Sequence, residues 1–166
     1  DVNKDYKYTE DDNEFLGTTT PKFRWTLRND FQIYKNFDIS FMLYSYWGHK
    51  GNFNIAKHNS GYQDRYNGFV LPYWTPENPT NNWARLNSSN GSASFNVWRD
   101  KSFVRLDNIS IGYFPKKLLK KVKFENLRIF TNIRNVAVWA PDWEFWDPEN
   151  DGPVPRTYSF GLSLTL

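Results

Sequence analysis

Hydrophobic and polar residues alternate along the first third of this chain. Residues 23 to 33 place Phe23, Trp25, Leu27, Phe31 and Ile33 on one face, with Asn29 as the single polar residue on that face, and Arg24, Thr26, Arg28, Asp30 and Gln32 on the other. The alternation resumes in residues 37 to 47, where Phe37, Ile39, Phe41, Leu43 and Trp47 share a face. Only Tyr34, Lys35 and Asn36 separate the two stretches. Two alternating segments around so short a turn predict a long β-hairpin over residues 23 to 47.

Three further strands are predicted in the second half of the chain. In residues 102 to 114 the apolar positions change phase, from Val104 and Leu106 to Ile109, Ile111 and Tyr113, and one extra residue near Asp107 and Asn108 would restore the pattern, as a β-bulge does. Residues 127 to 139 set Leu127, Ile129, Ile133 and Ala137 against Arg128, Asn132 and Arg134. Residues 157 to 166 alternate strictly, with Tyr158, Phe160, Leu162, Leu164 and Leu166 on one face. The chain is therefore predicted to be all-β, with five strands.

The connections between these strands differ in length. Short ones at residues 34 to 36 and 115 to 126 alternate with long ones at residues 48 to 101 and 140 to 156. Strands of about 9–11 residues with one apolar face, short turns on one side and long loops on the other are typical of transmembrane β-barrels. A soluble β-sandwich that turns its apolar face inward shows the same alternation. A soluble, aromatic-rich, carbohydrate-binding β-sandwich module is therefore the alternative.

Composition narrows the classes further. Aromatic residues make up 19% of the 166 residues, and such enrichment favours strands. The absence of cysteine excludes disulfides and thiolate metal sites. The net charge of +3 is too small to argue for a nucleic-acid partner.

Five segments, in order along the chain, resemble the C-terminal end of the SusC/RagA family of TonB-linked outer-membrane transporters. They are DVNKDYKYTEDD (residues 1 to 12), PKFRWTLRNDFQIYKNFDISFML (21 to 43), WTPENPTNNWARL (74 to 86), SFVRLDNISIGYFP (102 to 115) and RTYSFGLSLTL (156 to 166). Ala84 stands where the family usually has proline, and Leu166 where it usually ends on phenylalanine. Each segment is modest alone, but five in the family's order make the resemblance specific.

The resemblance implies the last five antiparallel strands of a large transmembrane outer-membrane β-barrel, of roughly 22 strands, with long extracellular loops. It implies uptake of glycans or peptides, without enzyme activity, in the outer membrane of a Gram-negative, Bacteroidetes-like bacterium. The implied partners are a SusD-like surface lipoprotein, the rest of the barrel, and the TonB complex, which would bind through an N-terminal part absent from these residues. Because the other strands are missing, we expect that these residues do not fold alone.

Orientation follows from the direction of the last strand. If residues 157 to 166 run toward the periplasm, residues 1 to 22, 48 to 101 and 140 to 156 are extracellular loops. Residues 34 to 36 and 115 to 126 are then periplasmic turns. Long loops outside and short turns inside are the usual arrangement in such barrels.

The first twelve residues place oxygen-bearing groups at the spacing of an EF-hand loop. Asp1, Asn3, Asp5, Thr9 and Asp12 occupy positions 1, 3, 5, 9 and 12, and Lys7 would add a backbone carbonyl. Tyr6 stands where such a loop has glycine, and Asp12 where it has a bidentate glutamate. The segment is therefore either a structural Ca²⁺ site, the one cofactor considered, or a solvated acidic turn.

The long loops are rich in aromatic residues. The candidates for contact with a substrate or a partner protein are Tyr62, Tyr66, Tyr73, Trp74, Trp83, Trp98, Trp143 and Trp146. Aromatic rings stack on sugar rings and anchor interfaces. The alternative is that these rings pack within the loops or lie in the aromatic girdle at the membrane surface.

Two catalytic or metal-binding interpretations are disfavoured. Glu144, Asp147, Glu149 and Asp151 include the two carboxylates that a glycosidase needs, but both would come from one short loop, which would be unusual. His49 and His58 have no third ligand spaced for zinc.

The last strand carries a candidate assembly signal. Ser159, Gly161, Leu164 and Leu166 resemble the β-signal by which outer-membrane barrels are recognised for insertion, with leucine in place of the final aromatic residue. Because a closed barrel has no free edge, this strand is expected to pair with the first strand of the barrel.

Overall fold

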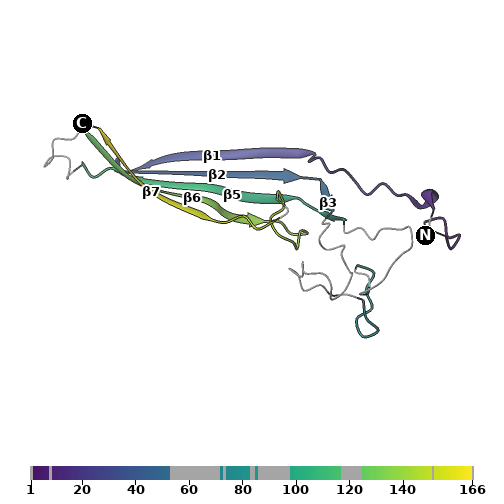
Figure 1. Ribbon diagram of the computed structural model, residues 1–166. Coiled ribbons are helices and arrows are strands. Elements are labelled where there is room, and N and C mark those ends of the chain that lie inside the picture. Colours follow the sequence, from purple (N-terminus) through teal and green to yellow (C-terminus); the bar gives the residue numbers. More distant parts are fainter. Residues whose placement is uncertain are drawn as a thin grey trace. The chain divides into compact units, whose positions relative to one another are not determined.

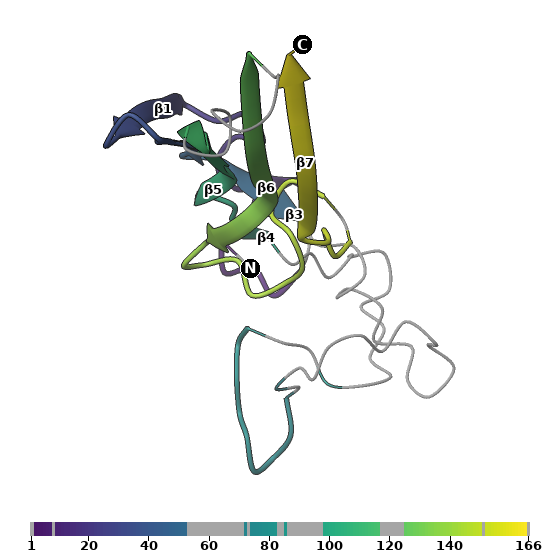
Figure 2. The ribbon, with the colours of Figure 1, turned by 90° about the vertical axis from the view of Figure 1, so that its left-hand side faces the viewer.

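The computed structural model describes residues 2–7, 9–52, 72, 74–82, 85, 98–116, 125–150 and 152–165. The chain divides into two compact units, Asp1–Thr20 with His49–Asp100, and Pro21–Gly48 with Lys101–Leu166. The second unit is one antiparallel sheet of five strands: β1 (Phe23–Ile33), β2 (Phe37–Trp47), β5 (Phe103–Tyr113), β6 (Asn126–Trp139) and β7 (Thr157–Thr165). The strands lie side by side in the order β1-β2-β5-β6-β7 (Figure 1). Seen after a turn of 90°, the sheet twists from β1 to β7 (Figure 2). The prediction of five antiparallel strands is confirmed.

The β1–β2 turn shows how residues with unusual backbone angles fix a hairpin. Tyr34 and Lys35 have positive φ angles of 49° and 60°, and the Asn36 N–H donates to the Ile33 carbonyl at 3.3 Å. Two left-handed residues in the centre of the turn match the twist of the flanking strands. The turn therefore pairs Ile33 with Phe37 and sets the register of the whole hairpin, up to Phe23 with Trp47.

The phase change in β5 is a bulge, as the sequence predicted. Met42 pairs with Asn108 but Leu43 with Leu106, so Asp107 has no partner on β2. On the other side of β5, Leu106 pairs with Ala137 and Asn108 with Arg134. Strand β6 therefore carries one extra residue opposite the bulge. The apolar residues on either side of Asp107 consequently share one face of the sheet.

The large apolar side chains of this sheet are mostly exposed, whereas a few residues on its other face are buried. The face formed by the apolar residues is largely exposed: it includes Phe23, Trp25, Leu27, Phe31, Ile33, Phe37, Ile111, Tyr113, Ile129, Trp139, Tyr158, Phe160, Leu162 and Leu164. Among the described residues, the buried hydrophobic side chains are Phe103, Leu127 and Trp143, whereas Arg105 and Asp147 are also buried. We call the face that bears Tyr44, Arg105 and Arg134 the polar face.

Aromatic pairs mark both ends of the apolar face. At the loop end, where β2 and β6 finish, the rings of Trp47 and Trp139 lie 6.2 Å apart. At the opposite end, called the turn end, the rings of Phe37 and Tyr113 lie 4.8 Å apart. Aliphatic and aromatic side chains fill the length between the two pairs.

The first unit has little regular structure in its described part. It contains the short 3-10 helix η1 (Glu10–Asp12) and a two-stranded sheet of β3 (Lys50–Asn52) and β4 (Trp98–Asp100). The Lys50 N–H donates to the Thr18 carbonyl at 2.8 Å and joins the N-terminal segment to β3. Within the described ranges, no helix combines the length and the hydropathy that a membrane-crossing helix needs.

Candidate functional site

A buried arginine lies on the polar face near the loop end. Arg105 of β5 pairs in register with Tyr44 of β2 and Val138 of β6. Its side chain is only 4% exposed. An unpaired charge in such a position lowers the stability of the fold by several kcal/mol. Burial of Arg105 is therefore tolerated only if the surrounding groups pair with its charge.

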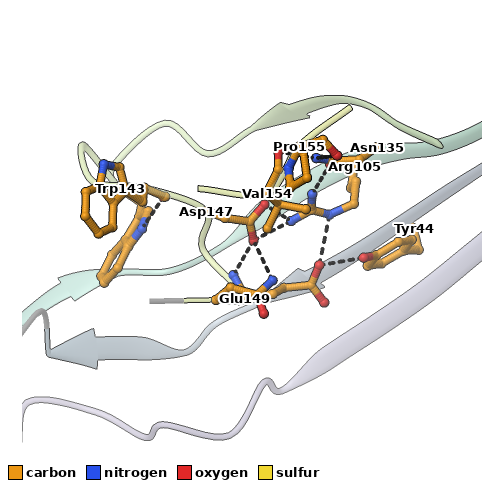
Figure 3. A network of polar contacts seen from close by, with 10 residues as sticks. Tyr44, Arg105, Asn135, Trp143, Asp147, Glu149, Val154 and Pro155 are labelled. Atoms are coloured by element: carbon orange, nitrogen blue, oxygen red, sulfur yellow. Dashed lines mark hydrogen bonds and ion pairs between the residues drawn. The ribbon is translucent and has the colours of Figure 1, made fainter. Parts of the chain in front are cut away.

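Four side chains bind the Arg105 guanidinium or its partners (Figure 3). Nη2 donates to both carboxylate oxygens of Asp147 at 2.7 Å, and Nε donates to Glu149 at 2.9 Å. Nη1 donates to Oδ1 of Asn135 at 2.6 Å. The Tyr44 hydroxyl completes the set by donating to Glu149. These five residues, called here the Arg105 network, join β2, β5, β6 and the loop between β6 and β7.

In the Arg105 network, the buried positive charge of Arg105 is paired with the carboxylates of Asp147 and Glu149. Burial alone would raise the pKa of Asp147, but the hydrogen bonds from Arg105 and from the Glu149 backbone N–H outweigh it, so this pKa lies below the ordinary value. The Arg105 Cζ also lies 5.5 Å from the centroid of the Phe103 ring and 5.9 Å from that of Tyr44, within the range of cation–π attraction. The loop between β6 and β7 is thereby tied to the sheet.

The lowered pKa of Asp147 predicts that the loop loosens in acid. A carboxyl group whose pKa is lower in the folded state stabilises the fold above its ordinary pKa of 3.8, and this contribution is lost as the pH falls through the folded-state value. We expect exchange of the Glu149 amide hydrogen, which is donated to Asp147 at 2.9 Å, to accelerate below about pH 4 after correction for the intrinsic rate. Hydrogen-exchange mass spectrometry of the complete protein measures this. Asp147→Asn should remove the acid dependence, and an unchanged dependence in that variant would contradict the assignment.

Asn135 provides a second anchor for the same loop. It lies opposite the β5 bulge with a positive φ of 52°, a conformation that asparagine tolerates better than most residues. Its Nδ2 donates to the Val154 carbonyl at 2.8 Å and to the Pro155 carbonyl at 3.4 Å. One side chain therefore binds both the buried arginine and the backbone that leads into β7.

The middle of the loop is held by Trp143. This ring is 6% exposed, and its Nε1 donates to the Trp146 carbonyl at 2.9 Å. The Phe145 ring packs edge-on at 5.0 Å, and the Lys101 Nζ lies 4.9 Å from the Trp143 centroid. These contacts give the loop a packed core of its own.

Four residues of the Arg105 network, all except Asp147, line a cavity of about 320 Å³ on the polar face. The other lining residues are Asp107, Arg134, Asn150, Val154, Pro155 and Thr157. A second cavity of about 380 Å³ lies beside it and shares Asn135 and Val154. Its lining is more apolar and includes Val138, Phe145, Trp146 and Pro153.

A second ion pair spans three strands at the turn end. Arg128 of β6 donates through Nε to Oδ1 of Asp38 in β2 at 3.0 Å, and through Nη2 to Oδ2. Gly112 of β5 lies in register with Asp38. A Cβ at position 112 would lie 2.6 Å from the Arg128 Nε and closer still to the Asp38 Oδ1. Glycine is therefore needed here for the ion pair to cross the middle strand.

Gly161 has a similar role in the last strand. It lies in register with Phe130 of β6, and an added Cβ would lie 2.8 Å from the Phe130 Cε1 and Cε2. The Arg128 Cζ lies 4.9 Å from the centroid of the same ring. The Phe130 ring thus occupies the space over Gly161. Ser159 and Leu164 of the candidate assembly signal also lie in β7, and Leu166 lies outside the described residues.

The predicted aromatic contact residues occupy different environments. Tyr62, Tyr66, Tyr73 and Trp83 lie outside the described residues, and Trp98 lies in β4. Trp74 is 38% exposed and Trp146 is 36% exposed, whereas Trp143 packs inside its loop. Trp74 and Trp146 are therefore the better placed for external contact, which stays a prediction.

The acidic N-terminal segment binds its own backbone. The described candidate ligands are Asn3, Asp5, Lys7, Thr9 and Asp12, and Asp1 lies outside the described residues. The Asp12 carboxylate accepts the Thr9 N–H at 2.8 Å and the Val2 N–H at 2.9 Å, and the first of these bonds is the main reason for its lowered pKa. In the part of the chain that the structure describes, no three histidine or acidic residues are grouped to hold a metal. The Ca²⁺ site stays a prediction, which calorimetric titration of the complete protein with Ca²⁺ tests.

The other loop residues considered above are placed as follows. Asp147 and Glu149 both bind Arg105, Glu144 is exposed, and Asp151 lies outside the described residues. His49 is buried and His58 lies outside the described residues. Two of the four carboxylates considered for glycoside hydrolysis, Asp147 and Glu149, therefore have a common structural partner.

Sequence reasoning did not identify Arg105 as the centre of the site. The available signal was an arginine on the polar face, two residues before the predicted bulge at Asp107, combined with a loop rich in carboxylates. Its partners are 30 to 44 residues away in the chain, so no local spacing points to them.

Comparisons with known proteins identify relatives of this chain by sequence. No protein-family model matches the chain. TonB-dependent receptor P26 of Formosa agariphila is 29% identical over an aligned length of 193 residues. The match covers 100% of this chain and 19% of the receptor. TonB-dependent receptor P3 of the same organism is 28% identical over 174 residues, covering 92% of this chain and 17% of the receptor. The chain thus spans less than a fifth of the length of these relatives.

Solved structures show the same fold. The RagAB peptide importer in its open-open state matches 96% of this chain and 19% of the importer chain, with a TM-score of 0.67 at 19% identity. Its closed-closed state matches 95% of this chain and 19% of the importer chain, with a TM-score of 0.69 at 19% identity. The five strands thus have the fold of part of an outer-membrane transporter barrel. The predicted resemblance to TonB-dependent transporters of the SusC/RagA type is confirmed.

Proposed function

We propose that this chain forms part of the membrane-spanning wall of a TonB-dependent, SusC-like importer in the outer membrane of a Gram-negative bacterium. The observation that carries the proposal is the exposure of the apolar face: its large side chains are exposed along the strands, whereas the buried ion pair of Arg105 and Asp147 lies on the side of the other face. Such a sheet is stable where lipid covers the apolar face and the polar face borders a lumen.

The cargo would be a glycan or a peptide, captured with the help of a SusD-like surface lipoprotein. The similarity to TonB-dependent receptors and to a peptide importer supports uptake powered through the TonB complex. We place the loop end outside the cell, where the Arg105 network would keep the loop between β6 and β7 in a fixed position. The similar proteins are receptors and transporters, and we propose no catalytic step for this chain.

A soluble carbohydrate-binding sandwich fits the sheet less well. In a sandwich, a second sheet of comparable length covers the apolar face. In the described ranges, the strands outside the five-stranded sheet are β3 and β4, with three residues each. They are too short to cover strands of 9 to 14 residues.

The test uses the complete protein in its native host. We expect it in the outer-membrane fraction, with a faster electrophoretic mobility in SDS before heating than after, as for a folded barrel. Deleting its gene, or the gene for TonB, should abolish uptake of the same labelled cargo, and affinity purification in detergent should recover a SusD-like lipoprotein identified by mass spectrometry. A protein that is monodisperse in buffer without detergent would overturn the membrane assignment.

A further inference from the structure

The 320 Å³ cavity beside the Arg105 network has a rigid wall. On one side, Glu149 is held by both Arg105 and Tyr44. On another, the Asn135 amide holds the Val154 and Pro155 carbonyls. A site that exists before its ligand arrives loses less free energy to ordering on binding. The volume lies near the lower end of the range for ligand pockets, so the cavity suits a small part of a larger cargo.

Two charged side chains of opposite sign line this cavity without an ion pair. Arg105 is occupied by Asp147, Glu149 and Asn135 and has little capacity left for a ligand. Asp107 and Arg134 also line the cavity, and neither forms an ion pair with any residue in the described ranges. The two residues lie on neighbouring strands, where Arg134 pairs in register with Asn108, the residue after Asp107.

This arrangement selects the chemistry of a ligand. A carboxylate can bind the planar guanidinium of Arg134 through two parallel hydrogen bonds. An ammonium group can bind Asp107 with a charge-assisted hydrogen bond. A polyanion would meet the carboxylates of Asp107 and Glu149, and a neutral sugar would use neither charge fully.

We propose that this cavity is a peptide-binding subsite of the importer, with Arg134 holding a carboxylate of the peptide and Asp107 an ammonium group. Asn150 and Thr157, which also line it, would bind the peptide backbone through amide and hydroxyl groups. The inference rests on the proposed function and deepens it, because it selects peptides over glycans for this position on the polar face.

The experiment measures binding to the complete transporter in detergent by calorimetry. The probes are trialanine with free termini, its N-acetyl form, its C-terminal amide, and maltohexaose as a neutral oligosaccharide. We expect Arg134→Gln to weaken trialanine binding about tenfold, because glutamine keeps one N–H donor but loses the charge and the second hydrogen bond, and to leave binding of the amide unchanged. Asp107→Asn should weaken trialanine binding to a similar extent and leave binding of the N-acetyl form unchanged.

Arg28→Gln is the matched control, because Arg28 lies on the same face but pairs with Asp30 and does not line the cavity. Unheated and heated electrophoretic mobility confirms that each variant is folded. Two outcomes would overturn the subsite: variants that bind trialanine as the wild type does, or variants that lose maltohexaose binding instead. TonB-dependent uptake of labelled cargo by the wild-type strain is measured separately. Absence of that uptake would contradict the proposed function, whereas the binding measurements on the variants test the subsite.

Discussion

Replacement of Arg105 by methionine is expected to release the loop between β6 and β7 from the sheet. The change removes the guanidinium and leaves the Asp147 carboxylate, whose side chain is 5% exposed, without its partner. Breaking a buried ion pair from one side costs about 3–5 kcal/mol, more than the local stability of most surface loops. Hydrogen-exchange mass spectrometry of the complete protein should show loss of protection at the Glu149 amide, while exchange in β1 stays as in the wild type.

The control for this prediction is the exposed ion pair between Arg28 and Asp30. Its atoms lie 3.2 Å apart, and the side chains are 70% and 62% exposed. Such a pair contributes about 0–1 kcal/mol, so Arg28→Met should leave exchange of the loop unchanged. A second substitution, Asp147→Leu in the Arg105→Met background, removes the stranded charge and should restore part of the protection elsewhere in the loop. The Glu149 amide is excluded from this comparison, because leucine cannot accept its hydrogen bond. If Arg105→Met leaves the loop fully protected, the buried ion pair does not hold it.

Gly161→Ala is expected to lower the stability of the last strand pair by about 1–3 kcal/mol, the usual cost of overpacking a closely packed position. The added methyl group would lie 2.8 Å or less from the Phe130 ring, which would have to leave its place near Arg128. The measurement is the temperature at which the unheated, fast-migrating form of the complete protein disappears in electrophoresis. We expect that temperature to fall.

A double-substitution cycle separates this packing effect from a recognition effect during insertion. With Phe130→Ala already present, Gly161→Ala meets no ring and should cost little further stability, so the two changes should not be additive. Ser163→Ala serves as a control, because Ser163 lies on the same strand and the same face as Gly161. Additive costs in the double variant would show that Phe130 is not the group that requires glycine at position 161.

The strands of this protein were predictable because their side-chain pattern is regular. The alternation from Phe23 to Trp47 determined both the hairpin and its register, and the phase change after Leu106 located the bulge at Asp107. The boundaries at the strand ends differ by one residue at most, as at Asn126, because a polar residue at an end carries no alternation signal.

The site was not predictable in the same way. Arg105 and Arg134 both occupy the polar face, yet one is buried and the other exposed, and the alternation of a strand does not distinguish them. What buries Arg105 is the loop that carries Asp147, whose path depends on tertiary contacts with Asn135 and Tyr44. The extra residue in β6 opposite the bulge was not predicted. Simple alternation along β6 already places Ala137 on the apolar face, so the pattern gives no sign of an extra residue.

The aromatic pairs at the two ends of the apolar face mark the length of the surface that lipid would cover. The 11 residues of β2 run from Phe37 to Trp47, and at about 3.3 Å per residue they span roughly 35 Å along the strand. At the tilt of about 45° found in outer-membrane barrels, this corresponds to roughly 25 Å along the membrane normal. A bilayer with a thicker hydrocarbon region would have to thin locally around this part of the wall or draw the aromatic rings into the acyl chains. The thermal stability of the complete protein should therefore depend on lipid chain length, with a maximum where the hydrocarbon thickness matches the distance between the two aromatic pairs.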